Sequence, residues 1–142
     1  MDRIDCAYKW LTRTALAYLG TPYRWGGDDP SGFDCSGFVL ECLKSVGFVD
    51  NQVDLTAEGL LAMFRESKIT TPREGALLFQ LNGQGTAIHV AICLDQWFQI
   101  AAAGGDRRTR QPNDAWRGNA FVRIRPIGRK SNQVICNPFG IQ

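Results

Sequence analysis

The chain has one histidine and no C-x-x-C pair among its 142 residues. Zinc sites in proteins need clustered cysteine and histidine ligands, so this scarcity argues against a structural metal. The five cysteines are odd in number and scattered, so at least one thiol is free. Cys6, Cys42 and Cys93 stand among apolar residues, where cysteine acts as a small buried hydrophobe. Cys35 differs, because its neighbours are polar and rich in glycine.

Strong charge and long apolar runs are also missing. The net charge is +2 and the pI is near 8.3, which is too mild to indicate nucleic acid as a partner. No stretch approaches the roughly 18 apolar residues that span a bilayer, and "MDRIDCAYKW" lacks the apolar core of a signal peptide. We therefore expect a soluble protein that is made in the cytoplasm and binds neither nucleic acid nor a membrane.

The remaining pattern predicts a single α+β domain over residues 1–142. Neither a linker nor a repeat is visible, and the length is near the commonest domain size. Apolar spacing predicts helices over 3–19, 35–46 and from the Thr56 N-cap to 67, and strands over 75–81, 87–94, 97–103 and 120–127. Helices followed by strands predict N-terminal helices packed on one face of an antiparallel meander. The segment from Val134 to Cys136 either adds an edge strand or trails free.

Cys35 is predicted to open the second helix, directly after Asp34, a good capping residue. At a helix N-terminus the backbone N–H groups and the helix dipole favour thiolate over thiol, so we expect the pKa of Cys35 to be lowered. This position suits a nucleophile. The alternative is a buried cysteine that happens to follow a cap.

A cysteine nucleophile needs a base, and His89 is the only histidine available. It stands near the start of "IHVAICL", an otherwise apolar strand, where a hydrogen-bonded core histidine is the alternative interpretation. A thiolate at a helix N-terminus and an imidazole on a neighbouring strand form the pair that papain-like hydrolases use. Together the two residues favour catalysis over coincidence.

The motifs around these residues resemble a known family. The stretches "GTPYRWGG", "FDCSGFV", "REGALLF" and "HVAICL" occur in this order. They are similar to the NlpC/p-sixty family of papain-like cysteine peptidases, which cut peptidoglycan stem peptides, and the resemblance covers about residues 12–105. It implies a papain-like fold with the catalytic cysteine at a helix N-terminus, Cys35 as nucleophile, His89 as general base, and no metal or cofactor.

The resemblance also implies roles for three residues near Cys35. Tyr23 would help to hold the substrate or the oxyanion, and Asp34 and Ser36 would line a subsite for the free amino end of a stem peptide. Trp25 either walls the cleft or is a buried anchor. The simpler alternatives are that Tyr23 anchors the loop, that Asp34 only caps the helix and that Ser36 is only a small first-turn residue.

One position departs from the family pattern. Relatives usually carry a polar side chain about twelve residues after the histidine to orient the imidazole, and here that position is Ala101. Alanine cannot accept the hydrogen bond. Gln99, two residues earlier on the same strand face, is one substitute; a backbone carbonyl or a water is another; an impaired enzyme is the third possibility.

The resemblance implies a peptidoglycan endopeptidase that cuts a γ-D-glutamyl to diamino-acid link through a thioester. "DAWRGNAFVRIRPIG" and the compact domain resemble phage-encoded members, which implies delivery to the cell wall by a virion tail or by lysis. The basic cluster Arg107, Arg108 and Arg110 is interpreted as a solvated loop, with binding to an anionic wall polymer as the alternative. Two other functions remain open: a papain-like amidase or acyltransferase on another amide, and a structural or wall-binding module without catalysis.

Overall fold

Helices come first and most strands follow in the computed structural model, which describes residues 3–29 and 31–140. The helices are α1 (Arg3–Ala17), α2 (Cys35–Ser45), α3 (Ala57–Phe64), which continues into a 3₁₀ turn (Arg65–Ser67), and α4 (Pro112–Gly118). The strands are β1 (Asp28–Asp29), β2 (Gly32–Phe33), β3 (Lys68–Ile69), β4 (Leu77–Leu81), β5 (Ala87–Cys93), β6 (Phe98–Ala103), β7 (Phe121–Pro126) and β8 (Gln133–Cys136). No helix in the described part of the chain is long and apolar enough to cross a membrane.

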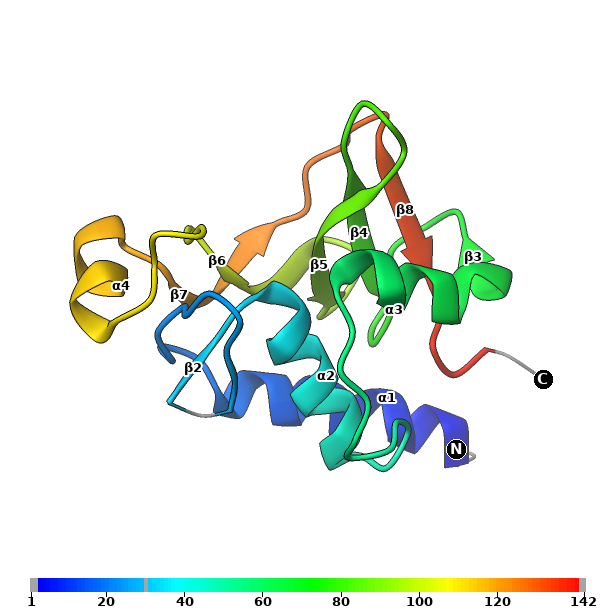
Figure 1. The fold of residues 1–142 in the computed structure, drawn as a ribbon. Coiled ribbons are helices and arrows are strands. Elements are labelled where there is room, and N and C mark those ends of the chain that lie inside the picture. The colour runs from blue at the N-terminus through cyan, green and yellow to red at the C-terminus, as the bar shows by residue number, and fades with distance from the viewer. Residues whose placement is uncertain (1–2, 30, 141–142) are drawn as a thin grey trace.

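The main sheet has the strand order β3-β8-β4-β5-β6-β7, with every neighbouring pair antiparallel. Strands β4 to β7 form the predicted meander, and the α+β class is confirmed (Figure 1). The edge position expected for residues 134–136 is wrong, because β8 inserts between β3 and β4, with Ile135 opposite both Ile69 and Leu78. The outer neighbour, β3, has only two residues and one is a lysine, so no apolar pattern predicts it.

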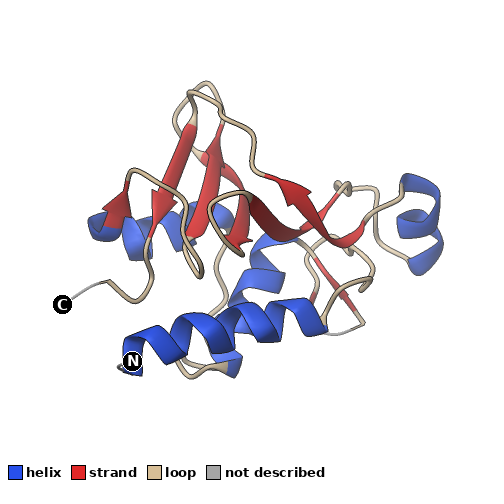
Figure 2. Cartoon of the chain, turned by 180° about the vertical axis from the view of Figure 1, so that it is seen from behind, coloured by secondary structure: helices blue, strands red, loops and turns tan. Residues whose placement is uncertain are grey.

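Helices α1, α2 and α3 cover one face of the sheet (Figures 1 and 2). The core between them is made of fully buried side chains from both layers, including Leu11, Phe38, Leu43, Leu60, Val90, Ile92 and Ile100. Side chains alternate between the two faces of a strand, so Ala91 and Cys93 of β5 point to the opposite face. There they join a second, smaller cluster with Ala76, Leu78 and Ala101.

Several element ends differ from the sequence prediction. The first helix ends at Ala17 and the second at Ser45, while the chain tightens into the 3₁₀ turn after Phe64. The hairpin of β1 and β2 and the short helix α4 were not predicted. Both lie in stretches dense in glycine, aspartate and arginine, where no apolar period exists to reveal them.

Candidate active site

The start of α2 is fixed by the side chain of Asp34. Its Oδ1 accepts hydrogen bonds from the Gly37 N–H at 2.7 Å and from Ser36 Oγ at 3.3 Å, and its Oδ2 accepts from the Gly26 N–H at 3.1 Å. The cap therefore satisfies a first-turn donor and also ties the glycine-rich loop to the helix. This arrangement holds Cys35 as the first residue of the helix, as the sequence predicts.

Cys35 meets the sheet where β5 and β6 separate. The two strands pair at Ile92 with Ile100 and at Cys93 with Gln99, and the described pairing ends there. The backbone N–H of Val90, beyond the end of this pairing, is directed at the Cys35 sulfur instead. Because Val90 follows His89 in the chain, this contact places the thiol beside the backbone of the strand that carries the histidine.

The acidity of Cys35 differs from the prediction. Burial raises the pKa of its thiol, and the charge of Asp34 raises it further, although N–H groups of Val90, Ser36 and Cys35 itself lower it. The helix N-terminus thus acts in the expected direction, but the loss of hydration outweighs it. The expectation of a lowered pKa is wrong, and the resting side chain is a thiol at neutral pH.

His89 is neutral for a related reason. Burial lowers the pKa of its imidazole, and the positive charges of Arg125 and Lys130 lower it further. Within residues 3–29 and 31–140 the ring makes no hydrogen bond to another residue. The alternative interpretation of His89, a core histidine that is hydrogen-bonded to another residue, is therefore not supported within the described residues. The thiol of Cys35 and the imidazole of His89 are thus both neutral, and the ring can still accept a proton.

Tyr23 lies near Cys35 and is 6% exposed. Burial raises the pKa of its phenol, followed by the nearby Cys35 and Asp34, so its hydroxyl stays protonated and can donate. The ring packs directly on the backbone of Gly105, where an added Cβ would lie 2.1 Å from Tyr23 Cδ1. Trp25, by contrast, is 44% exposed, so the interpretation as a buried anchor is wrong.

A cavity of about 260 Å³ is lined by Asp34 and Ser36, the two chain neighbours of Cys35. We call it the acidic cavity, because Asp28, Asp34 and Asp54 line it together with Ser36, while no lysine or arginine does so. Burial raises the pKa of Asp34, and its three hydrogen bonds oppose that effect. Asp34 is thus both the predicted helix cap and part of a cavity wall of negative sign.

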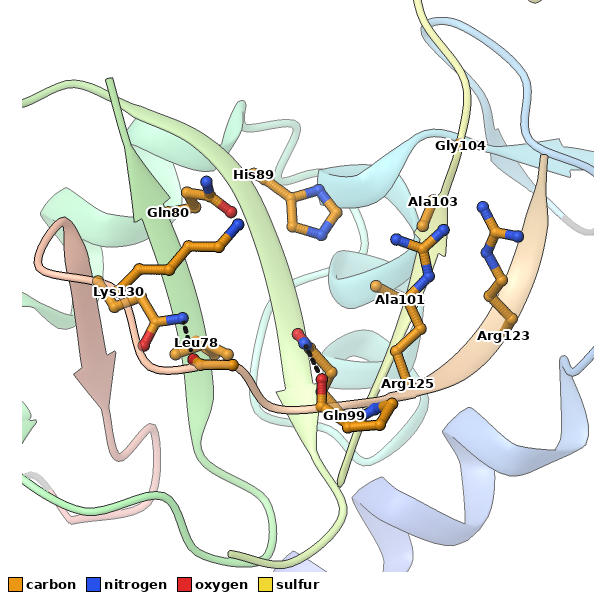
Figure 3. A pocket seen from close by; sticks show the side chains of 13 residues that line it. Leu78, Gln80, His89, Gln99, Ala101, Ala103, Gly104, Arg123, Arg125 and Lys130 are labelled. Atoms are coloured by element: carbon orange, nitrogen blue, oxygen red, sulfur yellow. Dashed lines mark hydrogen bonds between the residues drawn. The ribbon is translucent and has the colours of Figure 1, made fainter. Parts of the chain in front are cut away.

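A second cavity, of about 430 Å³, lies over the opposite face of the sheet (Figure 3). We call it the basic cavity: His89, Arg123, Arg125 and Lys130 line it, and no aspartate or glutamate is among its lining residues. Ala101 and Ala103 form part of its floor. Side chains of opposite charge therefore line the two cavities, one of which includes the chain neighbours of Cys35 and the other His89.

Gln99 lines the same cavity, but its amide is engaged elsewhere. The Nε2 atom donates to the Pro126 carbonyl at 3.3 Å, and Gln99 lies opposite Arg125 in the sheet (Figure 3). No hydrogen bond joins Gln99 to His89 in the described structure. Its role as a substitute for Ala101 stays a prediction that would require the side chain to change partner.

Sequence reasoning missed the three cations of the basic cavity and two of the three aspartates of the acidic one. Arg123 and Arg125 alternate along "FVRIRP", which indicates that they share one strand face. The alternation alone could not reveal that this face lies beside His89, because that depends on the register of β6 with β7. Lys130, Asp28 and Asp54 lie in loops or a two-residue strand, where spacing carries no such signal.

An α+β fold with a cysteine at a helix N-terminus beside a strand histidine is the arrangement of papain-like cysteine hydrolases. The model of the NlpC/P60 family matches residues 20–125. The chain belongs to this family.

Curated relatives and solved structures agree with this assignment. The chain is 62% identical over 108 residues to "Probable peptidoglycan endopeptidase LytE" of Bacillus subtilis, covering 75% of this chain and 31% of that protein. It is 33% identical over 94 residues to "Murein DD-endopeptidase MepH" of Escherichia coli, covering 63% and 34%. The NlpC/p60 domain of peptidoglycan hydrolase SagA superposes with a TM-score of 0.68 at 29% identity, covering 91% of this chain and 97% of that one. The chain thus spans about a third of the length of these two curated relatives.

Proposed function

We propose that this chain hydrolyses amide bonds in the stem peptides of peptidoglycan, with Cys35 as nucleophile and His89 as base. The observation that carries the proposal is the contact of the Cys35 sulfur with the N–H of Val90, the residue that directly follows His89 on β5. The names of LytE, MepH and SagA, which describe peptidoglycan or murein hydrolysis, support the same substrate class.

The chemistry follows from a neutral starting pair. His89 takes the thiol proton as the Cys35 sulfur forms a bond to the amide carbonyl, and the carbonyl π electrons move to the oxygen. The backbone N–H of Cys35 and the protonated hydroxyl of Tyr23 stabilise that oxyanion. The imidazolium then protonates the leaving amine as the C–N bond breaks. His89 later takes a proton from the water that attacks the thioester carbonyl, and it returns a proton to the Cys35 sulfur as the acid product leaves.

The acidic cavity supports a substrate with a free amino group on the acyl side. Asp28, Asp34 and Asp54 would attract an ammonium, and Ser36 Oγ offers a further acceptor. We propose on this basis that the enzyme acts on stem peptides with an exposed N-terminus, and that it cuts the γ-D-glutamyl to diamino-acid link. Action at the cell wall is part of the same proposal, and delivery by a phage remains a prediction.

The test is digestion of purified peptidoglycan and of synthetic tri- and tetrapeptide stems by the reduced protein, with products identified by mass spectrometry. Cys35→Ala should lose all cleavage, whereas Cys6→Ala, a half-buried thiol on α1, should keep it. The masses of the products identify the amide bond that is cleaved. Equal activity of the Cys35→Ala variant would refute the proposal.

A second function is favoured by Ala101. This side chain gives His89 no acceptor, so a wall-binding module without catalysis fits that one position. The same assay separates the two functions, because a binding module would co-sediment with peptidoglycan and release no product from any stem.

A further inference from the structure

The basic cavity gathers three positive charges without a counter-charge. Arg123, Arg125 and Lys130 make no ion pair within residues 3–29 and 31–140. The Nε atom of Arg123 is buried and has no hydrogen-bond partner in that part of the chain. Buried donors are nearly always satisfied, and like charges that share a cavity repel each other. A bound anion would satisfy this donor and offset the repulsion.

The arginines are held in place from the sheet. Arg123 lies directly opposite Ala101 in the pairing of β6 with β7, and Arg125 lies opposite Gln99. The Arg123 guanidinium rests on the backbone of Gly104, where an added Cβ would lie 2.4 Å from Nη2. The small side chains of Ala101 and Ala103 leave open the space between these cations and His89 (Figure 3).

Within the described part of the chain, His89 also lacks a hydrogen-bond acceptor on the side of its ring that faces this space. Its imidazole has no acceptor among the described residues, so nothing fixes which nitrogen carries the proton. Arg125 and Lys130 also disfavour the imidazolium that forms when Cys35 is deprotonated. An anion in the basic cavity would neutralise the cations and accept the hydrogen bond of the ring together.

We propose that the basic cavity is a carboxylate subsite in which the bound carboxylate joins Arg123 and Arg125 to the ring N–H of His89. The carboxylate then performs the orienting role that Ala101 cannot, so the substrate completes the catalytic arrangement. His89 must reach the leaving nitrogen, and the carboxylate beside it therefore belongs to the residue that departs with that nitrogen. This assignment of the ligand rests on the proposed function, whereas the anion site itself does not.

The first experiment needs no catalysis. Because His89 is the only histidine, its NMR signals report its pKa directly in the full chain. Acetate is compared with chloride at equal ionic strength, since salt alone screens the cations. Acetate should raise the pKa of His89 saturably by about 0.5 or more, because a close opposite charge favours the imidazolium. Equal shifts in acetate and chloride would overturn the site.

Matched variants separate the cavity from the general charge of the protein. Arg125→Gln should abolish the acetate-specific rise, while Arg129→Gln should keep it, because Arg129 carries the same charge and does not line the basic cavity. If Arg125→Gln loses the native NMR spectrum, Arg125→Lys is used in its place. Lysine keeps the positive charge but lacks the two parallel N–H donors of a guanidinium, so it should weaken the acetate-specific rise in the pKa of His89. A full acetate response in these Arg125 variants would contradict the proposal.

The second experiment identifies the ligand. A tripeptide stem whose departing residue ends in a free carboxylate is compared with its carboxamide. The free acid should have a kcat/KM about tenfold higher or more, the size expected of a hydrogen bond to a charged group. Arg125→Gln should remove this preference and Arg129→Gln should retain it. An acetate response without any cleavage would keep the anion site and refute the proposed function, and equal cleavage of acid and amide would refute the substrate assignment.

Discussion

Replacement of Asp34 by alanine tests how much one side chain contributes to the folded site. Asp34 accepts the Gly37 N–H at 2.7 Å and the Gly26 N–H at 3.1 Å. The first bond caps α2, and the second fastens the loop that precedes it. In the Asp34→Ala variant both donors lose their partner, and the end of α2 that carries Cys35 is held less firmly.

The expected loss of stability follows from these two bonds. Removal of an N-cap costs about 1 kcal/mol, with a range of roughly 0.5–2. Loss of the second backbone partner adds about 1 kcal/mol more. The sum is about 2 kcal/mol, with a range of roughly 1.5–3, which lowers the Tm of a domain of this size by roughly 5–12 °C.

Thr56→Ala is the matched control for this variant, because Thr56 caps α3 through a single bond from the Gly59 N–H at 3.2 Å. It should lose about 1 kcal/mol. Urea unfolding followed by circular dichroism gives both values, and Asp34→Asn, which keeps an acceptor oxygen, should fall between wild type and Asp34→Ala. If Asp34→Ala loses no more than Thr56→Ala, the bond to Gly26 contributes nothing and the reasoning fails.

Two further predictions concern the residues around the thiol. Gly105→Ala should cost about 1–3 kcal/mol by urea unfolding, because its Cβ would overlap the ring of Tyr23, whereas Gly83→Ala, with open space around it, should change little. No added loss over the Gly83 variant would contradict the packing described. The pKa of His89 is lowered in the folded protein, so the unfolded chain binds more protons and the unfolding free energy should fall as the pH drops below about 6.5. The difference between the unfolding free energies of the wild type and of His89→Gln, measured against pH, isolates the contribution of His89. A difference that does not change from pH 7 to pH 5 would argue against it.

Periodicity predicted the elements that build the core and missed those that do not. Helix α2 and strand β5 carry regular apolar spacing, and both appear within a residue of the expected bounds. The position of β8 in the sheet was not predicted by this spacing. Its pairing with β3 and β4 joins segments more than fifty residues apart, and short-range spacing says nothing about such partners.

The same distinction between local sequence and long-range pairing applies to the candidate active site. The position of Cys35 behind its cap follows from local sequence, whereas the position of Tyr23 near it was implied only by the family resemblance. The protonation state of Cys35 does not follow from local sequence, because it depends on burial by β5, which outweighs the helix N-terminus. The charges that surround His89 come from β7 and the loop after it, so only the completed sheet brings them together.

The insertion of β8 makes the order of synthesis matter. While the chain leaves the ribosome, β4 to β7 can pair with one another, but β4 keeps one open edge until residues 133–136 emerge. An unpaired apolar edge is a template for pairing with other chains. The same late segment brings Asn137 to the hydroxyl of Tyr8 and the ring of Phe139 against that of Tyr8. Strand β8 therefore covers the open edge of β4, and the residues after it hold the first helix against the sheet, so a nascent chain stalled before residue 133 would be exposed to aggregation.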